Sequence, residues 1–484
     1  GENWTVTSGL RASFGPVYRF APTETGAHRY NPLTQIRRGD NEVRDAQVLA
    51  DMLVDPEGAL RERSHWQLRA FELLVAVMLW TLYAERQKTL ARVAELLADP
   101  QRPVSNLLEE MLGRSIKNGL PHPVVAAGAR QLLDMAEAER SGVVSTALGY
   151  LVLYRDPVLA RATEVSDFSI EDIITGARPV SLYLVIPPEE ISRLKALLRL
   201  VLNQILKRLT EVAARQNGAG RRVLLMLDEF PQLGKLDFFE HALAYIRGYR
   251  IKACLVAQSL NQIAQAYGEH SSILDNAHIR VAFACNDERT AKRLSDMLGV
   301  TTETRSQMNY AGSRMAPWLG HTMVSRQEVP RALLTPGEVM QLPPDESLVF
   351  VGGSPPIRAR KLRYFAEPTF QGRVRAPILV SPPKGPGAPS DWDTVAPPPL
   401  PPAPASKPAE PPVRPRRAPR APDAKQQAFS FAPAVAAAAA LDTLSTAVEP
   451  PVVIEDDLGA AIAGPTTAIA AQFALDPDNH DPSF

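Results

Sequence analysis

Five apolar residues run directly into two adjacent carboxylates at Val223-Leu224-Leu225-Met226-Leu227-Asp228-Glu229. A short apolar run of this kind is typical of a strand buried in a parallel sheet. Parallel sheets bind ligands at the carboxyl ends of their strands, where Asp228 and Glu229 would emerge. In ATP-hydrolysing enzymes an aspartate there binds Mg²⁺ beside the phosphates, and a following glutamate can activate the attacking water. The alternative is a strand that ends in acidic residues with no catalytic role.

Two further polar residues accompany this strand. Gln258 follows the next predicted strand, Ile251 to Ala257, and its amide would reach the same sheet edge, where it could contact the γ-phosphate or the attacking water. Taken alone, it also fits a surface residue at a strand end. Arg247 ends the helix predicted between the two strands, and its guanidinium could stabilise phosphates bound by a neighbouring subunit. Taken alone, it also fits a cation at a helix C-terminus.

The phosphate-binding loop that such enzymes use, G-x-x-x-x-G-K-[ST], occurs nowhere in the 484 residues. The first residue is Gly1 and not methionine. We therefore expect the sequence to be the greater part of a nucleotide-driven motor whose front end is missing. On this interpretation the chain alone is inactive as an ATPase.

Composition restricts the remaining possibilities. The 53 basic and 53 acidic residues cancel, so any surface that binds DNA must be local. The two cysteines, Cys254 and Cys285, lie in apolar runs and fit reduced, cytosolic thiols better than a disulfide. The apolar run Leu73 to Tyr83 is about half the length of a membrane span and predicts a buried core helix. His122 lies between two prolines, where we expect a surface loop.

The alternation of strands and helices predicts an α/β fold with a parallel, doubly wound sheet. A long helical pattern with no strand-like alternation predicts an all-α domain inserted between strands. Past Phe365 the chain becomes rich in Pro and Ala, which predicts a disordered tail. The first thirty residues are expected to be sheet edge and loop. The predicted division is 1–40 and 166–365 for the nucleotide-binding domain, 41–165 for the inserted helical domain, and 366–484 for the tail.

Several motifs together resemble the TraG/TraD-type coupling ATPases of conjugation and type IV secretion. The resemblance runs in order from about residue 1 to residue 365, and the tail beyond it matches nothing useful. It rests on Gly1-Glu2-Asn3-Trp4, His28-Arg29-Tyr30-Asn31-Pro32-Leu33, the strand and double proline of Pro179 to Pro188, Asp228-Glu229-Phe230-Pro231-Gln232-Leu233-Gly234, Arg247, Ala257-Gln258-Ser259 and Leu333-Leu334-Thr335-Pro336-Gly337-Glu338-Val339.

The resemblance implies a homo-hexameric motor with a RecA-like P-loop NTPase sheet that uses ATP and Mg²⁺. Proteins of this family are anchored at the cytoplasmic face of the bacterial membrane by transmembrane helices that this sequence lacks. They deliver relaxase-bound single-stranded DNA, or a relaxase or effector protein, to the type IV secretion channel, and the helical domain helps to select the cargo. Asp228 matches the Mg²⁺-binding acid and Glu229 the catalytic glutamate. Arg247 matches the arginine that acts in trans, and Gln258 the glutamine that monitors nucleotide.

Two other hypotheses remain open. In the first, the chain is a non-catalytic module that recruits cargo or docks on a channel, and the acidic pair is a relic. In the second, it is a chromosome-partitioning or genome-packaging translocase of the same RecA-like class. The inserted helical domain argues against the second.

Overall fold

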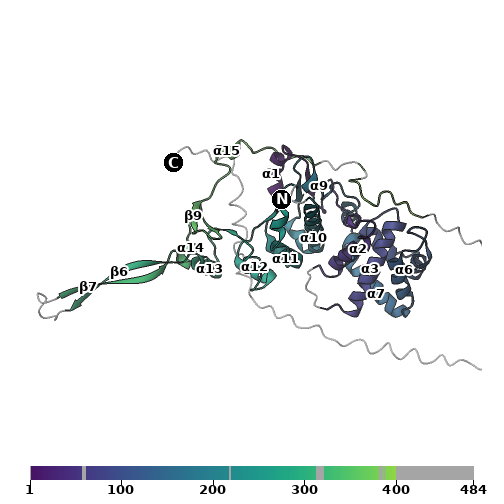
Figure 1. Cartoon of the computed structure of the whole chain (residues 1–484), viewed down its shortest axis with the longest axis horizontal. Coiled ribbons are helices and arrows are strands. Elements are labelled where there is room, and N and C mark those ends of the chain that lie inside the picture. Colours follow the sequence, from purple (N-terminus) through teal and green to yellow (C-terminus); the bar gives the residue numbers. More distant parts are fainter. Residues whose placement is uncertain are drawn as a thin grey trace, which may run out of the picture. The chain divides into compact units, whose positions relative to one another are not determined.

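The computed structural model describes residues 2–56, 62–216, 220–311, 321–380, 385 and 387–398 (Figure 1). Most of the tail that the sequence predicts to be disordered, from residue 399 onwards, lies outside the described residues.

Two pairs of parallel strands form the part of the fold that carries the acidic pair. Strand β1 (Val17–Phe20) pairs with β2 (Ser181–Leu184), and β3 (Val223–Leu227) pairs with β4 (Ile251–Leu255). The parallel pairing predicted for these strands is confirmed. The register aligns Leu227 with Leu255, so the residues that follow both strands emerge at one edge.

A second sheet is antiparallel, and here the structure departs from the predicted parallel sheet. Strand β5 (Ile279–Ala282) pairs with β8 (Glu346–Val351), which pairs with β9 (Ile357–Arg360). A tight turn joins β8 to β9 and includes Gly353 at a φ of 80°. A short turn of this kind can connect only antiparallel strands.

A long two-stranded ribbon was also not predicted from the sequence. Strands β6 (Val300–Ala311) and β7 (His321–Ala332) pair in antiparallel register over 12 residues each (Figure 1). The run Thr301 to Gln307 is entirely polar, so it lacks the apolar alternation that marks a half-buried strand.

Helices fill the chain between the paired strands β1 and β2, and this part of the chain is called the helical stretch below. Figure 1 shows α2, α3, α6 and α7 gathered around a common centre, and α3 contacts each of the other three. Whether this stretch is a separate domain with the predicted boundaries stays a prediction. The helices are α2 (Glu42–Val54), α3 (His65–Ala84), α4 (Leu90–Leu97), α5 (Val104–Gly113), α6 (Pro123–Leu133), α7 (Glu137–Leu151) and α8 (Pro157–Ala162).

Helix α3 is the central element of this group. Ser64 and Gln67 form a capping box at its start, which satisfies backbone N–H groups of the first turn. Within the described part of the chain, α3 alone is long and apolar enough to cross a membrane, yet 72% of its apolar window is buried inside the structure. The expectation of a buried core helix is confirmed.

The N-terminal residues form a helix, α1 (Glu2–Ala12), where the sequence predicted sheet edge and loop. Trp4 is 6% exposed and packs edge-on against Tyr183 of β2, with ring centroids 5.0 Å apart. The hydroxyl oxygens of Thr7 and Tyr183 lie 2.6 Å apart. These tertiary contacts stabilise a helix whose Thr, Val, Ser and Gly residues have low helix propensity.

The remaining helices lie between and after the strands along the chain. The longest, α10 (Ile191–Arg215), buries an apolar stripe that includes Leu194, Leu197 and Val201. The helix predicted between β3 and β4, with Arg247 at its end, stops at Leu243, and Arg247 lies in a separate 3₁₀ turn. The other elements are η1 (Leu33–Gln35), η2 (Val152–Arg155), α9 (Asp172–Thr175), η3 (Pro188–Glu190), η4 (Phe230–Leu233), α11 (Asp237–Leu243), η5 (Ile246–Tyr249), α12 (Leu260–Tyr267), α13 (Glu288–Leu298), α14 (Pro336–Met340) and α15 (Pro368–Gln371).

The start of the predicted tail differs from the expectation. Residues 387–398 pack on the helical stretch, and the Trp392 side chain is fully buried. The burial of one large aromatic side chain offsets part of the entropy lost when the segment becomes ordered.

Candidate functional site

The acidic pair and the glutamine meet beyond the ends of β3 and β4. The ladder between these strands continues past them, because Val256 N donates to Leu227 O and Phe230 N donates to Val256 O, both at 3.0 Å. The amide Nε2 of Gln258 donates to Glu229 Oε1 at 3.3 Å. Glu229, Gln258 and Asp228 are all exposed to solvent. The structure therefore brings together at one edge three of the four residues singled out in the sequence.

Glu229 stands on a constrained backbone. Its φ of 48° lies in the left-handed region, which non-glycine residues rarely adopt. The next residue, Phe230, is fully buried and stacks on Tyr267 at 5.1 Å, with Phe239 at 5.4 Å. The Phe230 side chain thus anchors the turn and leaves the preceding carboxylate exposed to solvent. A strained residue held by its surroundings is frequent at functional sites.

Gly234 is the last residue of the motif Asp228 to Gly234, and a side chain at this position would clash with its surroundings. Its φ is 69°, and a Cβ added there would lie 2.3 Å from Arg199 Nη2. Arg199 is 3% exposed and donates from Nε to Leu233 O at 2.8 Å, which ties the turn to α10. The final glycine of Asp228-Glu229-Phe230-Pro231-Gln232-Leu233-Gly234 is therefore needed for the close approach of this arginine.

Asp228 has a partner that the sequence reasoning missed. Asn3 of α1 donates from Nδ2 to Asp228 Oδ2 at 2.9 Å. The segment Gly1 to Trp4 was noted only as part of the family resemblance, with no role for its residues. Through this contact, helix α1 orients the Asp228 carboxylate, which is one of the two carboxylates of the acidic pair.

Arg247 lies away from the acidic pair of its own chain. It is exposed in η5, which precedes β4, whereas the acidic pair follows β3. Because β3 and β4 are parallel and five residues long, the two ends are separated by roughly 16 Å at about 3.3 Å per residue. Within the described residues its guanidinium makes no hydrogen bond or ion pair. An arginine so placed is free to contact something other than its own acidic pair.

The donor atoms of the edge fit a magnesium ion that arrives with phosphates. No group of three or more His, Cys, Asp or Glu side chains among the described residues could hold a metal ion. Mg²⁺ is usually held by one or two carboxylates together with waters and substrate phosphates, so it does not need such a cage. The exposed Asp228 and Glu229 supply the one or two carboxylates that such a magnesium site needs.

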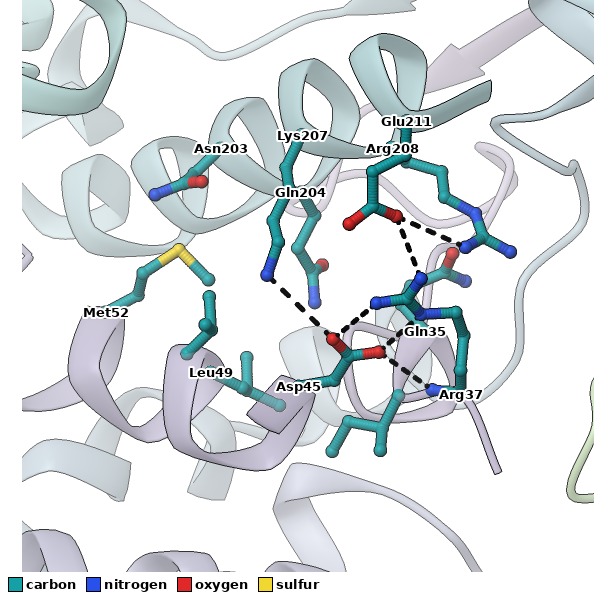
Figure 2. Close-up of a pocket in the computed structure, with 12 residues that line it drawn as sticks. Gln35, Arg37, Asp45, Leu49, Met52, Asn203, Gln204, Lys207, Arg208 and Glu211 are labelled. Atoms are coloured by element: carbon teal, nitrogen blue, oxygen red, sulfur yellow. Dashed lines mark hydrogen bonds and ion pairs between the residues drawn. The ribbon is translucent and has the colours of Figure 1, made fainter. Parts of the chain in front are cut away.

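A second polar cluster lies where α2 meets α10, around a pocket of about 50 Å³ (Figure 2). Figure 2 shows Arg37 between two carboxylates: its Nε donates to Asp45 Oδ2 at 2.7 Å and its Nη1 lies 3.1 Å from Glu211 Oε2. Burial of Asp45 opposes its ionisation, but the bonds from Arg37 outweigh this effect and hold the pKa of Asp45 below its usual value. Burial lowers the pKa of Lys207, whose Nζ lies 3.9 Å from Asp45 Oδ1. The ion pairs of this cluster therefore link the helical stretch to α10.

Comparison with known proteins shows to which family the chain belongs. A family model described as type IV secretory system conjugative DNA transfer matches residues 1–384. A conjugal transfer protein TraG of Escherichia coli is 39% identical over 405 residues, which cover 78% of this chain and 64% of that protein. A VirD4 protein of Rhizobium rhizogenes is 28% identical over 385 residues, which cover 76% of this chain and 54% of that protein. The chain thus spans less than two thirds of the length of these relatives.

Solved structures show the same fold. The bacterial conjugative coupling protein TrwB, in a trigonal form with sulphate, matches with a TM-score of 0.53 and 17% identity, over 74% of this chain and 76% of that one. TrwB in complex with ADP and Mg²⁺ matches with a TM-score of 0.50 and 17% identity, over 72% and 74%. At this identity the likeness concerns the fold alone. On the match of the family model, the chain belongs to the type IV secretory system conjugative DNA transfer family, whose members include the TraG and VirD4 coupling proteins.

Proposed function

We propose that this chain works in the coupling protein of a conjugative DNA transfer or type IV secretion system, as part of an ATP-driven motor. In this proposal the motor recruits relaxase-bound single-stranded DNA, or a relaxase or effector protein, and delivers it to the secretion channel. The observation that carries the proposal is the contact between Glu229 and Gln258 beside Asp228, at the ends of adjacent parallel strands. This is the sheet edge at which such folds bind nucleotides.

Each residue of the edge has a distinct proposed role. Asp228, oriented by Asn3, would hold Mg²⁺, which when bound neutralises charge on the phosphates. Glu229 would accept a proton from the attacking water, since its carboxylate is exposed and held in place by the buried Phe230. Gln258 would orient the same water, because its amide already lies on the Glu229 carboxylate.

ATP and Mg²⁺ are proposed cofactors of the whole protein. TrwB has been solved with ADP and Mg²⁺, and we extend that ligand pair to this chain on the fit of its acidic edge. The 484 residues contain no G-x-x-x-x-G-K-[ST] motif, so the phosphates would be cradled by a segment outside them.

A homo-hexamer at the cytoplasmic face of the bacterial membrane is the proposed assembly. Arg247, exposed at the far end of β4 from its own acidic pair, would reach the nucleotide of the next subunit. An arginine supplied from a neighbour stabilises negative charge in the transition state of phosphoryl transfer. The assembly would place one acidic edge and one trans arginine at each interface.

The first test replaces the proposed base. In a version of the protein that carries a phosphate-binding loop, Glu229→Gln should leave ATP binding intact and lower the hydrolysis rate by about 10²- to 10⁴-fold. Steady-state ATPase measurements and fluorescent-nucleotide binding give both quantities. Gln232→Ala, which removes the other side-chain partner of Glu229, is the control and should change the rate much less. Full activity of Glu229→Gln would exclude the role as base.

The trans role of Arg247 is tested by mixing subunits. Arg247→Ala and Glu229→Gln hexamers should each be inactive, whereas mixed hexamers contain some interfaces with an intact glutamate and an intact arginine. Hydrolysis should therefore partly return in mixtures. If mixtures stay as inactive as the parents, Arg247 does not act in trans.

The alternative function is a non-catalytic module that recruits cargo or docks on the channel. The absence of a phosphate-binding motif from these residues favours it for the chain on its own. If ATP fails to bind even when a phosphate-binding loop is present, this alternative replaces the motor.

A further inference from the structure

Residues 387–398 form a strap across the helical stretch. The strap begins where Ala388 N donates to Ser166 O, and Gly387 there adopts a φ of 89°. It ends where Arg114 Nη2 donates to Pro398 O at 2.7 Å. The two attachment residues, Ser166 and Arg114, lie on different sides of α8 in the sequence, so the strap bridges separate parts of the helical stretch.

Trp392 is the main anchor of the strap. Its side chain is fully buried, and its indole Nε1 donates to Ile36 O at 2.5 Å. The ring packs edge-on against Tyr83 of α3, with centroids 5.0 Å apart. An indole that buries its ring and also satisfies its N–H is typical of an anchor in a recognition pocket.

The floor of this pocket is itself fixed. The Tyr83 hydroxyl donates to Glu42 Oε2 at 2.7 Å, and Glu42 is 1% exposed. The same carboxylate also contacts Lys117 Nζ and lies 3.0 Å from His122 Nε2. A buried and fully bonded network of this kind holds the Tyr83 ring in one orientation. The Tyr83 side of the pocket is therefore held by contacts within the helical stretch and not by the strap.

The groove and the strap are complementary in charge. Trp392 stands between two exposed acidic residues, Asp391 and Asp393. Asp391 Oδ2 accepts a hydrogen bond from the backbone N of Arg38 at 3.4 Å, and its charge acts on the nearby Arg37 guanidinium, whose pKa is raised chiefly by Asp45 and also by Asp391. Burial lowers the pKa of Lys88, and the nearby Asp393 opposes this effect. Lys88 Nζ also donates to Val395 O at 3.1 Å.

The strap carries its own local turn. Ser390 N donates to Asp393 Oδ2 at 2.7 Å, and Trp392 N donates to Ser390 Oγ at 3.2 Å. Both bonds join residues within the same four-residue stretch, so a short free peptide can form them as well. A turn that is formed locally lowers the entropy lost on binding.

We propose that the groove around Ile36, Tyr83 and Lys88 is a binding site for a short peptide with a tryptophan between two acidic residues, and that residues 387–398 occupy it within the same chain. The strap is then a tethered ligand, and the start of the tail is held on the helical stretch. A free peptide of the same chemistry competes for the groove. This inference concerns the helical stretch and does not depend on ATP hydrolysis.

The test uses the full chain and a fluorescently labelled peptide of residues 387–398. With Trp392→Ala in the chain, the groove is vacated and the peptide should bind with saturation. The unaltered chain should bind it at least about tenfold more weakly, because a tethered segment competes at an effective concentration in the millimolar range. A peptide in which alanine replaces the tryptophan should bind neither chain. Fluorescence anisotropy measures all of these affinities.

Equal binding to the two chains, or no binding to the Trp392→Ala chain, would overturn the proposal. If Trp392→Ala prevents folding, the double variant Asp391→Arg and Asp393→Arg replaces it, since both positions are exposed. Repulsion from Arg37 and Lys88 should then release the strap and raise peptide binding several-fold over that of the unaltered chain. Unchanged binding by that variant would equally overturn the proposal.

Discussion

Helix α3 and strand β3 are both apolar in sequence, yet they are buried to very different extents. The side chains of α3 from Leu73 to Trp80 are at most 3% exposed. In β3, Leu224 is 55% exposed and Met226 is 58% exposed. The helical stretch covers the segment of α3 from Leu73 to Trp80, whereas one face of β3 stays open among the described residues. A row of exposed apolar side chains is typical of a surface that packs against another element or subunit.

The largest expected effect tests this difference with one substitution at two sites. Met78→Ala in α3 should lower the free energy of unfolding by about 2–5 kcal/mol, because it leaves a cavity in a close-packed core. Met78 is fully buried, whereas its matched control, Met226 in β3, is 58% exposed. Met226→Ala should therefore cost less than about 1 kcal/mol. Denaturant unfolding followed by circular dichroism measures both.

If Met78→Ala and Met226→Ala lowered the free energy of unfolding equally, the difference in burial between α3 and β3 would be contradicted. In a hexamer the contrast should change: if the open face of β3 packs against a neighbouring element, Met226→Ala should lower the stability of the assembly more than that of the isolated chain.

A second pair contrasts glycines in the same two regions. Gly234→Ala, beside the acidic edge, should destabilise the protein by about 1–3 kcal/mol, because φ is positive there and the added Cβ meets Arg199. Gly149→Ala in α7 has open space around the added Cβ. It should stabilise the chain by about 0.5–1 kcal/mol, because alanine has less entropy to lose in a helix. Thermal unfolding gives the sign of each change.

Gly234→Ala should also lower ATP hydrolysis, since a shift of this turn moves Glu229. Gly149→Ala should leave hydrolysis unchanged. A neutral or stabilising effect of Gly234→Ala would mean that the turn around Gly234 is less constrained than its geometry indicates.

The smallest effect concerns the joint between the helical stretch and α10. Arg37 holds the pKa of Asp45 below its unfolded value, so this pair stabilises the folded state above about pH 4 and stops doing so as the pH falls through the lowered pKa. Asp45→Asn should therefore cost about 1 kcal/mol at pH 7 and progressively less below about pH 4. Denaturant midpoints of both proteins at several pH values measure the difference. Asp40→Asn, at an exposed position, is the matched control and should show little such change.

Much of the fold was predictable because its signals are local. The apolar run Val223 to Leu227 predicted a parallel strand, and the run Leu73 to Tyr83 predicted a buried helix. The meeting of Gln258 with Glu229 followed from the rule that parallel strands end at the same edge. The ribbon of β6 and β7 was not predictable in this way, since its first strand is polar.

Some residues were misjudged because their surroundings come from elsewhere in the chain. His122 lies between two prolines and was expected on the surface, yet it is 1% exposed because the Glu42 carboxylate and the Tyr83 ring pack against it. Trp392 was part of a predicted disordered tail, yet it is fully buried. A flanking proline or a Pro-rich composition predicts only the conformation of the nearby backbone, and it does not predict whether distant residues bury the side chain.

The sequence by itself therefore determined the parallel pairing of the strands that carry the acidic pair, the helical character of the long stretch between β1 and β2, and the acidic pair with its glutamine. Each of these follows from apolar spacing and residue chemistry within a few positions. Only the tertiary structure decided that Asn3 orients Asp228, that Arg247 lies far from its own acidic pair, and that Trp392 fills a pocket beside Tyr83. Asn3 and Asp228 are 225 positions apart, and Trp392 is 356 positions from Ile36, whose carbonyl accepts its indole N–H. No local pattern encodes such pairings, because they depend on how the whole chain packs.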